Sequence, residues 1–126
     1  MNKKILLAED DEFTQYMMTA IFKALGYEYD IAADGEECQE LVSANPERYG
    51  VILMDIHMPN VSGVEAAQAI RSHPGNPPRD IPIIAVTADG DYLTEEAIQT
   101  NKMNGHLKKP IVASEVNSVV EMYCAV

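Results

Sequence analysis

The chain has 126 residues, and 20 acidic against 9 basic residues give it a formal net charge of −11 at pH 7. This length suits one domain, predicted here over residues 1–126, which buries roughly two-thirds of the surface of its unfolded chain. The negative charge opposes contact with nucleic acid and with anionic membranes, so we expect neither as a partner.

The cysteines and the N-terminal residues indicate a cytoplasmic protein. Cys38 and Cys124 lack the spacing of a zinc site or a disulfide framework, so we expect two reduced residues that pack in the interior. The apolar run at residues 5–8 is stopped by four acidic residues, which leaves it too short for a signal sequence or a membrane span.

Strand patterns and helix patterns alternate along the chain. Short apolar runs between turn residues predict strands, and apolar residues at helical spacing predict helices. The expected order is a strand at 5–8, a helix at 12–25, a strand at 27–33, a helix at 34–44, a strand at 49–54, a helix at 63–72, a strand at 83–86, a helix at 92–100, a strand at 106–108 and a helix at 113–123.

Several element boundaries have their own signals. Gly26 is expected to end the first helix, and Asp34 with Glu37 three residues later is typical of a capping-box start. The proline-rich residues 73–80 are predicted to form a surface loop. Apolar residues recur at helical spacing along the first helix, at Phe13, Tyr16, Met17, Ala20, Ile21, Ala24 and Leu25.

Strands that are apolar on both faces and separated by helices predict a doubly wound α/β domain, with one parallel sheet, right-handed crossovers and helices on both sides. Ligands of such sheets bind beyond the carboxyl ends of the strands. Polar side chains, or exposed backbone groups, follow four of the predicted strands and are expected to meet at that edge: Glu9, Asp10, Asp55, Thr87, Ala88 and Lys109.

Three carboxylates at one edge favour a cation. Two carboxylates about 5 Å apart repel by about 3 kcal/mol at an effective dielectric constant near 20. Oxygen ligands without clustered Cys or His favour a hard ion such as Mg²⁺. His57, His73 and His106 are scattered along the chain, and none is expected to bind a metal through its ring.

Taken together, these motifs resemble the receiver domain of two-component response regulators across essentially the whole chain; they are Glu9-Asp10, Asp55-Ile56-His57-Met58-Pro59 with Gly63, Val86-Thr87-Ala88 and Lys109-Pro110. The resemblance implies a flavodoxin-like sheet of strand order 2-1-3-4-5. It also implies a phosphorelay role, in which Asp55 accepts a phosphoryl group from a phosphohistidine. Such a domain is a phosphoacceptor that assists its own Mg²⁺-dependent phosphorylation and dephosphorylation, and no conventional enzyme.

The resemblance assigns a metal site. Asp10 and Asp55 are expected to bind Mg²⁺ directly, together with the backbone carbonyl of His57. Glu9 is expected to bind the ion through a water molecule.

The remaining roles concern the phosphoryl group. Lys109 is expected to contact its oxygens, and the Thr87 hydroxyl and the N–H of Ala88 to donate hydrogen bonds to them. Phosphoryl transfer needs in-line positioning and compensation of negative charge, which these groups suit. Asp55 must be ionised to attack, and we expect the nearby cations to keep its pKa down.

Partners and output also follow from the resemblance. The expected phosphodonor is a sensor histidine kinase or a histidine phosphotransfer domain. The expected output surface is formed by the fourth helix, the fifth strand and the last helix, and the weakly amphipathic residues 91–104 are its most mobile part. Both a stand-alone receiver and a receiver from a hybrid sensor kinase fit the sequence.

Some positions depart from the common family pattern. His106 stands where the family usually has Tyr or Phe, so it is a switch residue, a pH reporter or an ordinary surface histidine. Residues 61 and 62 are Val-Ser where the family often has Met-Asp, and Ser62 is suited to cap the next helix. His57 and Asp89 occupy positions at which the family tunes the access of hydrolytic water.

Two other functional classes fit the sequence less well. A phosphohydrolase of the haloacid dehalogenase group needs a second acid two residues beyond its nucleophilic aspartate, and here that position is His57. A pure interaction module with a receiver-like fold would have lost the acidic pair, Asp55 or Lys109, and all of these are present. Both alternatives are therefore disfavoured.

Overall fold

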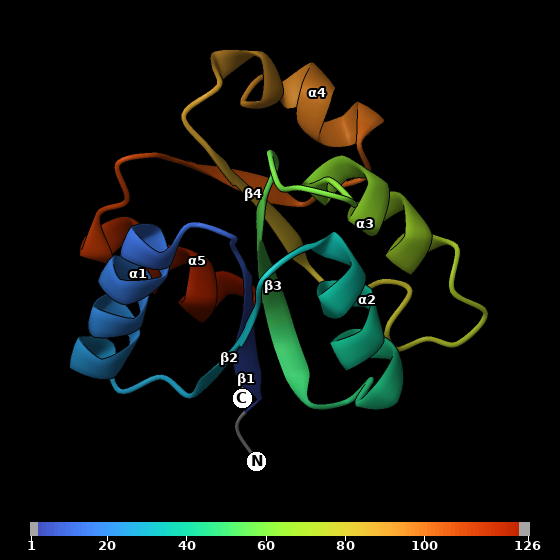
Figure 1. The fold of residues 1–126 in the computed structure, drawn as a ribbon, viewed down its shortest axis with the longest axis horizontal. Helices are drawn as coiled ribbons and strands as arrows, with labels where there is room; N and C mark the ends of the chain where they lie inside the picture. The colour runs from blue at the N-terminus through green and yellow to red at the C-terminus, as the bar shows by residue number, and fades with distance from the viewer. Residues whose placement is uncertain (1–2, 124–126) are drawn as a thin grey trace.

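The computed structural model describes residues 3–123, which form a five-stranded parallel sheet flanked by helices (Figure 1). The strand order β2-β1-β3-β4-β5 confirms the predicted doubly wound α/β fold. In chain order the elements are β1 (Lys4–Ala8), α1 (Glu12–Leu25), β2 (Tyr29–Ala32), α2 (Gly35–Ala44), β3 (Tyr49–Asp55), α3 (Gly63–Arg71), β4 (Ile83–Thr87), the 3-10 helix η1 (Gly90–Tyr92), α4 (Glu95–Thr100), β5 (Gly105–Lys108) and α5 (Ala113–Tyr123).

Two apolar cores lie on opposite faces of the sheet. Helices α1 and α5 cover one face, and α2 and α3 cover the other (Figure 1). The first face buries Met18 and Phe22 of α1 together with Val116 and Val120 of α5. The central strand β3 is buried along its whole length, because both faces of the sheet are covered.

Helix ends follow local rules of capping. Asp11 caps α1 by accepting the N–H of Thr14, and Gly26 ends this helix with φ +79°, a backbone conformation that glycine adopts without steric cost. The carboxylate of Asp34 accepts the N–H of Glu37 at the start of α2, as the sequence pattern predicted. Ser62 does cap α3, in a complete capping box with Glu65.

Two predicted elements differ from the observed ones. The strand expected at residues 27–33 is confined to Tyr29–Ala32, because the N–H of Tyr27 donates to the carbonyl of Phe22 and closes α1. The helix expected at residues 92–100 is divided into η1 and a short α4. Thr94 separates them, because its hydroxyl caps α4 by accepting the N–H of Ala97.

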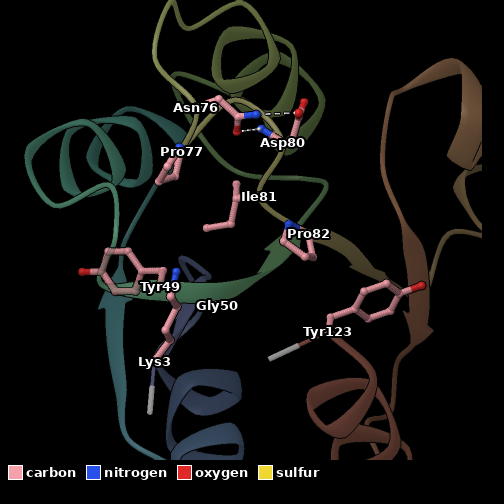
Figure 2. A pocket seen from close by; sticks show the side chains of 9 residues that line it. All are labelled: Lys3, Tyr49, Gly50, Asn76, Pro77, Asp80, Ile81, Pro82 and Tyr123. Atoms are coloured by element: carbon pink, nitrogen blue, oxygen red, sulfur yellow. Dashed lines mark hydrogen bonds between the residues drawn. The ribbon is translucent and has the colours of Figure 1, made fainter. Parts of the chain in front are cut away.

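The loop at residues 73–80 closes one side of a hollow at the amino edge of the sheet (Figure 2). This cavity has a volume of about 330 Å³, and its lining includes Tyr49, Ile81 and Tyr123. Asn76 and Asp80 are joined by two hydrogen bonds within the loop, which hold it in shape.

Within residues 3–123, no helix has both the length and the apolar character to span a bilayer. Cys38 is buried in the core on the α2 side of the sheet, as predicted, and Cys124 lies outside the described residues.

Candidate functional site

A pocket of about 590 Å³ opens at the carboxyl edge of the sheet. Its position follows from the register, because Ala8 pairs with Met54, Asp55 with Val86, and Thr87 with Lys108. The residues that follow these strands therefore project into one space. All of the residues that the sequence assigned to the site line this pocket: Glu9, Asp10, Asp55, His57, Thr87, Ala88 and Lys109.

Three of the carboxylates that line the pocket form a cluster. Oxygens of Glu9, Asp10 and Asp55 lie within 4.8 Å of one another. Glu9 is only 1% exposed and Asp55 5%, whereas Asp10 is exposed. This set of hard oxygen donors fits a divalent cation such as Mg²⁺.

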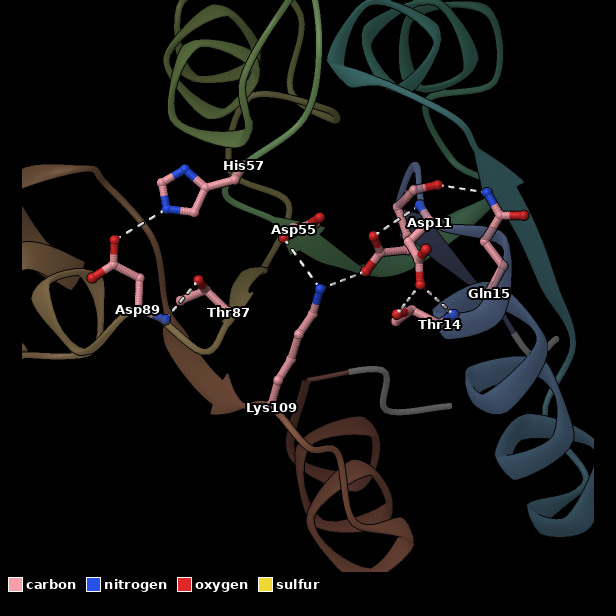
Figure 3. A network of polar contacts seen from close by, with 9 residues as sticks. Asp11, Thr14, Gln15, Asp55, His57, Thr87, Asp89 and Lys109 are labelled. Carbon is pink, nitrogen blue, oxygen red and sulfur yellow. Dashed lines mark hydrogen bonds and ion pairs between the residues drawn. The ribbon is translucent and has the colours of Figure 1, made fainter.

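Lys109 places one positive charge beside these carboxylates. Its ammonium group donates a hydrogen bond of 2.9 Å to Oε1 of Glu9 and lies 3.5 Å from Oδ1 of Asp55. Figure 3 shows the side chain reaching across the pocket to Asp55. Burial acts to lower the pKa of Lys109, but the contacts with Glu9 and Asp55 outweigh burial and raise it, so the ammonium stays charged.

The protonation of Asp55 differs from the expected behaviour. Burial, followed by the neighbouring Glu9, raises the pKa of Asp55 to about 7, and Lys109 only partly opposes this effect. The expectation of a depressed pKa counted a metal cation as well as the lysine. Lys109 alone does not supply enough positive charge to keep Asp55 fully ionised at neutral pH.

The backbone holds Asp55 firmly at the end of β3. The N–H of Gly63 donates to the carbonyl of Ile56 at 3.0 Å, which brings the start of α3 against the end of the strand. A Cβ atom on Gly63 would lie 2.1 Å from the carbonyl oxygen of Asp55. Only glycine allows this approach, so the end of β3 and the start of α3 are in close backbone contact.

Thr87 faces the same pocket from β4. Its side chain is buried, and its Oγ1 accepts the N–H of Asp89 at 3.0 Å. The hydroxyl proton remains able to donate to a ligand, since this contact uses only an acceptor site of the oxygen. The N–H of Lys109 donates to the Thr87 carbonyl, so β4 and the segment after β5 are tied together.

His57 and Asp89 form a contact that sequence reasoning missed. Nε2 of His57 lies 3.1 Å from Oδ2 of Asp89, across one side of the pocket (Figure 3). A hydrogen bond from the N–H of Asp91, and then the contact with His57, lower the pKa of Asp89. The His57 ring also meets Tyr92 edge-on at 5.3 Å between centroids. The sequence did contain a signal for this contact, because His57 and Asp89 each stand two positions after the end of a strand, and the two strands are neighbours in the sheet.

The turn between β1 and α1 contributes two further residues. Asp11 is exposed, its N–H donates to Oε2 of Glu9 at 3.2 Å, and its carboxylate caps α1 by accepting the N–H of Thr14. Gln15 donates from Nε2 to the carbonyl of Glu9 at 2.6 Å. The position of an Asp directly before a helical pattern is a capping signal that could have identified Asp11.

An apolar groove shares Thr14 and Lys109 with the pocket. A groove of about 170 Å³ between α1 and residues 109–111 is mostly apolar. Phe13 beside it is 70% exposed, so the apolar residues of α1 divide between the core and the surface. His106 is exposed on the edge strand β5.

Residues 5–121 match the response regulator receiver domain family. The polar-differentiation response regulator DivK of Brucella anthropi is 32% identical over 123 residues, which cover 98% of this chain and 97% of that protein. The hybrid signal transduction histidine kinase I of Dictyostelium discoideum is 35% identical over 112 residues, which cover 86% of this chain. The chain spans about 6% of the length of this kinase, and likewise of the hybrid kinase B of the same organism.

Solved structures agree. The receiver domain of the sensor histidine kinase PA1611 from Pseudomonas aeruginosa, whose active-site cleft holds a coordinated magnesium ion, is 32% identical with a TM-score of 0.84, and the match covers 100% of both chains. The receiver domain of Ssk1 from Saccharomyces cerevisiae, crystallised with the phosphotransfer protein Ypd1, has a TM-score of 0.81 at 21% identity and covers 98% and 90% of the two chains, which supports the fold. The chain therefore belongs to the response regulator receiver domain family of two-component systems.

Proposed function

We propose that this domain accepts a phosphoryl group on Asp55 within a two-component phosphorelay. One observation carries the proposal: Asp55, almost fully buried at the end of the central strand, faces the pocket beside Lys109 and two further carboxylates. A buried, rigidly held carboxylate next to an ammonium group has the character of a nucleophile for a phosphoryl group.

In the proposed transfer step, the phosphoryl group moves from a histidine of the donor to Asp55. An ionised oxygen of Asp55 attacks the phosphorus of a phosphohistidine in line with the bond to the imidazole nitrogen. The P–N bond breaks, its electron pair stays with the imidazole, and a new O–P bond makes an acyl phosphate on Asp55. The pKa of about 7 leaves part of Asp55 protonated near neutral pH, so added positive charge favours the reactive form.

Magnesium fits the donor set, and we assign it to Asp10 and Asp55 directly, to the backbone carbonyl of His57, and to Glu9 through water. When bound, the ion supplies positive charge that offsets the carboxylates and the incoming phosphoryl group. The magnesium ion of the PA1611 receiver, a relative with 32% identity, supports this assignment.

Three groups on two other strand ends then bind the phosphoryl oxygens. Lys109 neutralises their charge, while the Thr87 hydroxyl and the N–H of Ala88 donate hydrogen bonds. The N–H of Lys109 donates to the carbonyl of Thr87 at 3.0 Å, so the backbone segments that carry the hydroxyl donor and the cation lie side by side. Such preorganised groups stabilise developing charge without rearranging during the reaction.

His57 and Asp89 control how long the phosphoryl group persists. Their contact closes one side of the pocket, where a hydrolytic water would approach the phosphorus. Through its own hydrogen bond to Thr87, Asp89 also links this side to the phosphoryl-binding hydroxyl. The domain thus assists both the gain and the loss of its phosphoryl group.

A sensor histidine kinase or a histidine phosphotransfer domain is the proposed donor, in the cytoplasm. The proposed output surface comprises α4, β5 and α5, which bind a downstream protein. Helix α4 suits a responsive element, because only Ile98 of its six residues is buried.

Incubation with acetyl phosphate and Mg²⁺, followed by intact-mass analysis, tests the assignment. The wild type should gain one phosphoryl group, and Asp55→Asn should gain none. Asp80→Asn, the same change at an exposed aspartate, is the matched control and should behave as the wild type. A phosphoryl gain on Asp55→Asn, or none on the wild type, would contradict the proposed function.

A further inference from the structure

We propose that Gln15 is a positioning residue for the magnesium site, because its side-chain amide orients the peptide unit that joins Glu9 to Asp10. This inference rests on the proposed function of the pocket. Gln15 lies at the end of the first turn of α1, and its Nε2 donates to the carbonyl oxygen of Glu9 at 2.6 Å. Figure 3 shows this amide pointing from the helix back to the turn.

The Glu9 carbonyl lies just beyond the last paired residue of β1. The pairing of β1 with β3 ends at Ala8, and the N–H of Glu9 still donates to the carbonyl of Ala32, the last residue of β2. The carbonyl of Glu9 is instead met by Gln15 from the helix. A side chain therefore continues the hydrogen bonding of the backbone beyond the strand.

Fixing this carbonyl fixes two proposed metal-binding residues. A peptide unit is planar, so the direction of the Glu9 carbonyl sets the plane from which Asp10 projects. Asp10 is exposed, and packing does not hold its side chain. Its direction toward the pocket thus depends on the backbone that Gln15 holds.

The side chain of Glu9 is restrained by more contacts than that of Asp10. Its carboxylate accepts hydrogen bonds from Lys109 and from the N–H of Asp11, and its side chain is buried. Loss of the Gln15 amide should therefore disturb Asp10 more than Glu9. The acceptor Asp55 lies on another strand and should keep its place.

The expected effect is on metal affinity. Removing groups that orient metal ligands commonly lowers affinity by about 10-fold to 100-fold. We expect Gln15→Met, which keeps the length of the side chain but has no donor, to weaken Mg²⁺ binding by about 10-fold. The maximal rate of phosphorylation should persist at saturating Mg²⁺, since Asp55, Lys109 and Thr87 are unchanged.

Calorimetric titration with Mg²⁺ alone measures the affinity, and phosphorylation by acetyl phosphate over a series of Mg²⁺ concentrations measures the rate. Gln15→Glu is the second variant: it lacks the donor yet adds a negative charge, which by attraction alone would strengthen Mg²⁺ binding. Weaker binding in both variants supports the proposal. Gln68→Met, an exposed glutamine on α3, is the matched control and should bind Mg²⁺ as the wild type does.

Three results would overturn the inference: unchanged Mg²⁺ affinity in Gln15→Met, tighter binding in Gln15→Glu, or an equal loss in Gln68→Met. A maximal rate that stays low at saturating Mg²⁺ would also overturn it, because a general structural defect would then explain the loss. A wild type that binds Mg²⁺ but takes no phosphoryl group contradicts the proposed function and leaves the affinity comparison intact.

Discussion

One aspartate at each edge of the sheet has a shifted pKa, and the two shifts have opposite directions: Asp30 at the amino edge is partly buried, and Asp55 at the carboxyl edge is buried. At the amino edge, Asp30 accepts a hydrogen bond of 2.7 Å from the Tyr49 hydroxyl and lies 3.5 Å from Lys4 and 3.6 Å from Arg48. Burial acts to raise the pKa of Asp30, but these partners outweigh it and lower the pKa. At the carboxyl edge, the pKa of Asp55 rises to about 7. At the amino edge, neighbouring residues stabilise the charged form of Asp30. At the carboxyl edge, Lys109 alone does not offset the carboxylates, and a bound cation can supply the missing positive charge.

Arg71 shows how complete the bonding of the amino edge is. From the end of α3, its guanidinium donates to the carbonyls of Lys102, Arg79 and Ile81 and to the side chain of Asn104, at 2.7 to 2.9 Å. These four hydrogen bonds join the loop before β4 to the turn before β5. The amino edge therefore stabilises the fold, whereas the carboxyl edge keeps unbalanced charge for function.

Removal of Arg71 is the strongest test of this contrast. Arg71→Met deletes all four hydrogen bonds and leaves acceptors without their donors, so we expect a loss of about 2–4 kcal/mol in the free energy of unfolding. Urea unfolding measures this loss. Arg79→Met, at an exposed arginine, is the control and should change stability by about 0.5 kcal/mol or less. Similar losses in both variants would remove the special role of Arg71.

The pH dependence of stability should separate the two aspartates. The pKa of Asp55 is raised in the folded state, so its contribution is present below about pH 4 and is lost as the pH rises through about 7. Without metal, Asp55→Asn should thus be more stable than the wild type at about pH 8, by about 1–2 kcal/mol, with the difference vanishing toward about pH 4.

Asp30 should show the reverse profile. Its lowered pKa gives stability that is present above about pH 4 and is lost on further acidification. Asp30→Asn should be less stable than the wild type at about pH 7, and the two should converge in acid. Thermal unfolding in the presence of a chelator measures both series. Parallel profiles for the two variants would refute the contrast.

A smaller effect is expected from Asp10→Ala. Removing one of the three carboxylates lessens their repulsion, so the metal-free domain should be unchanged or more stable by about 1 kcal/mol or less. Mg²⁺ affinity should fall in the same variant. Calorimetry and thermal unfolding measure the two quantities, and an unchanged affinity would count against Asp10 as a ligand.

The smallest effect on stability is expected at the His57–Asp89 contact. Both side chains are partly exposed, so Asp89→Ala should change the free energy of unfolding by about 0–1 kcal/mol. The lifetime of the phosphorylated form should change nonetheless, because the contact closes one side of the pocket. Loss of the phosphoryl group, followed by intact mass, gives the lifetime. An unchanged lifetime in both His57→Ala and Asp89→Ala would remove their proposed role.

Sequence alone specified the parallel sheet and the edge at which Asp10, Asp55 and Lys109 meet. It did so because strand ends in a parallel sheet share one edge, whatever their distance along the chain. It did not reveal the amide of Gln15 or the contact between His57 and Asp89. These depend on the direction of side chains across turns, which hydrophobic spacing does not encode. The raised pKa of Asp55 depends on its burial and on its distances to Glu9 and Lys109, which the order of residues in the chain does not give.

The close contact at Gly63 predicts that natural variants of this residue disturb the main chain at Asp55. An alanine there would push its methyl group into the main chain of Asp55 itself, since a Cβ would stand 2.1 Å from that carbonyl oxygen. A substitution at Gly63 can therefore abolish signalling, although glycine has no side chain that could take part in the chemistry. A search for inactive receiver domains that checks only the carboxylates, the lysine and the threonine of the pocket would not detect such a variant.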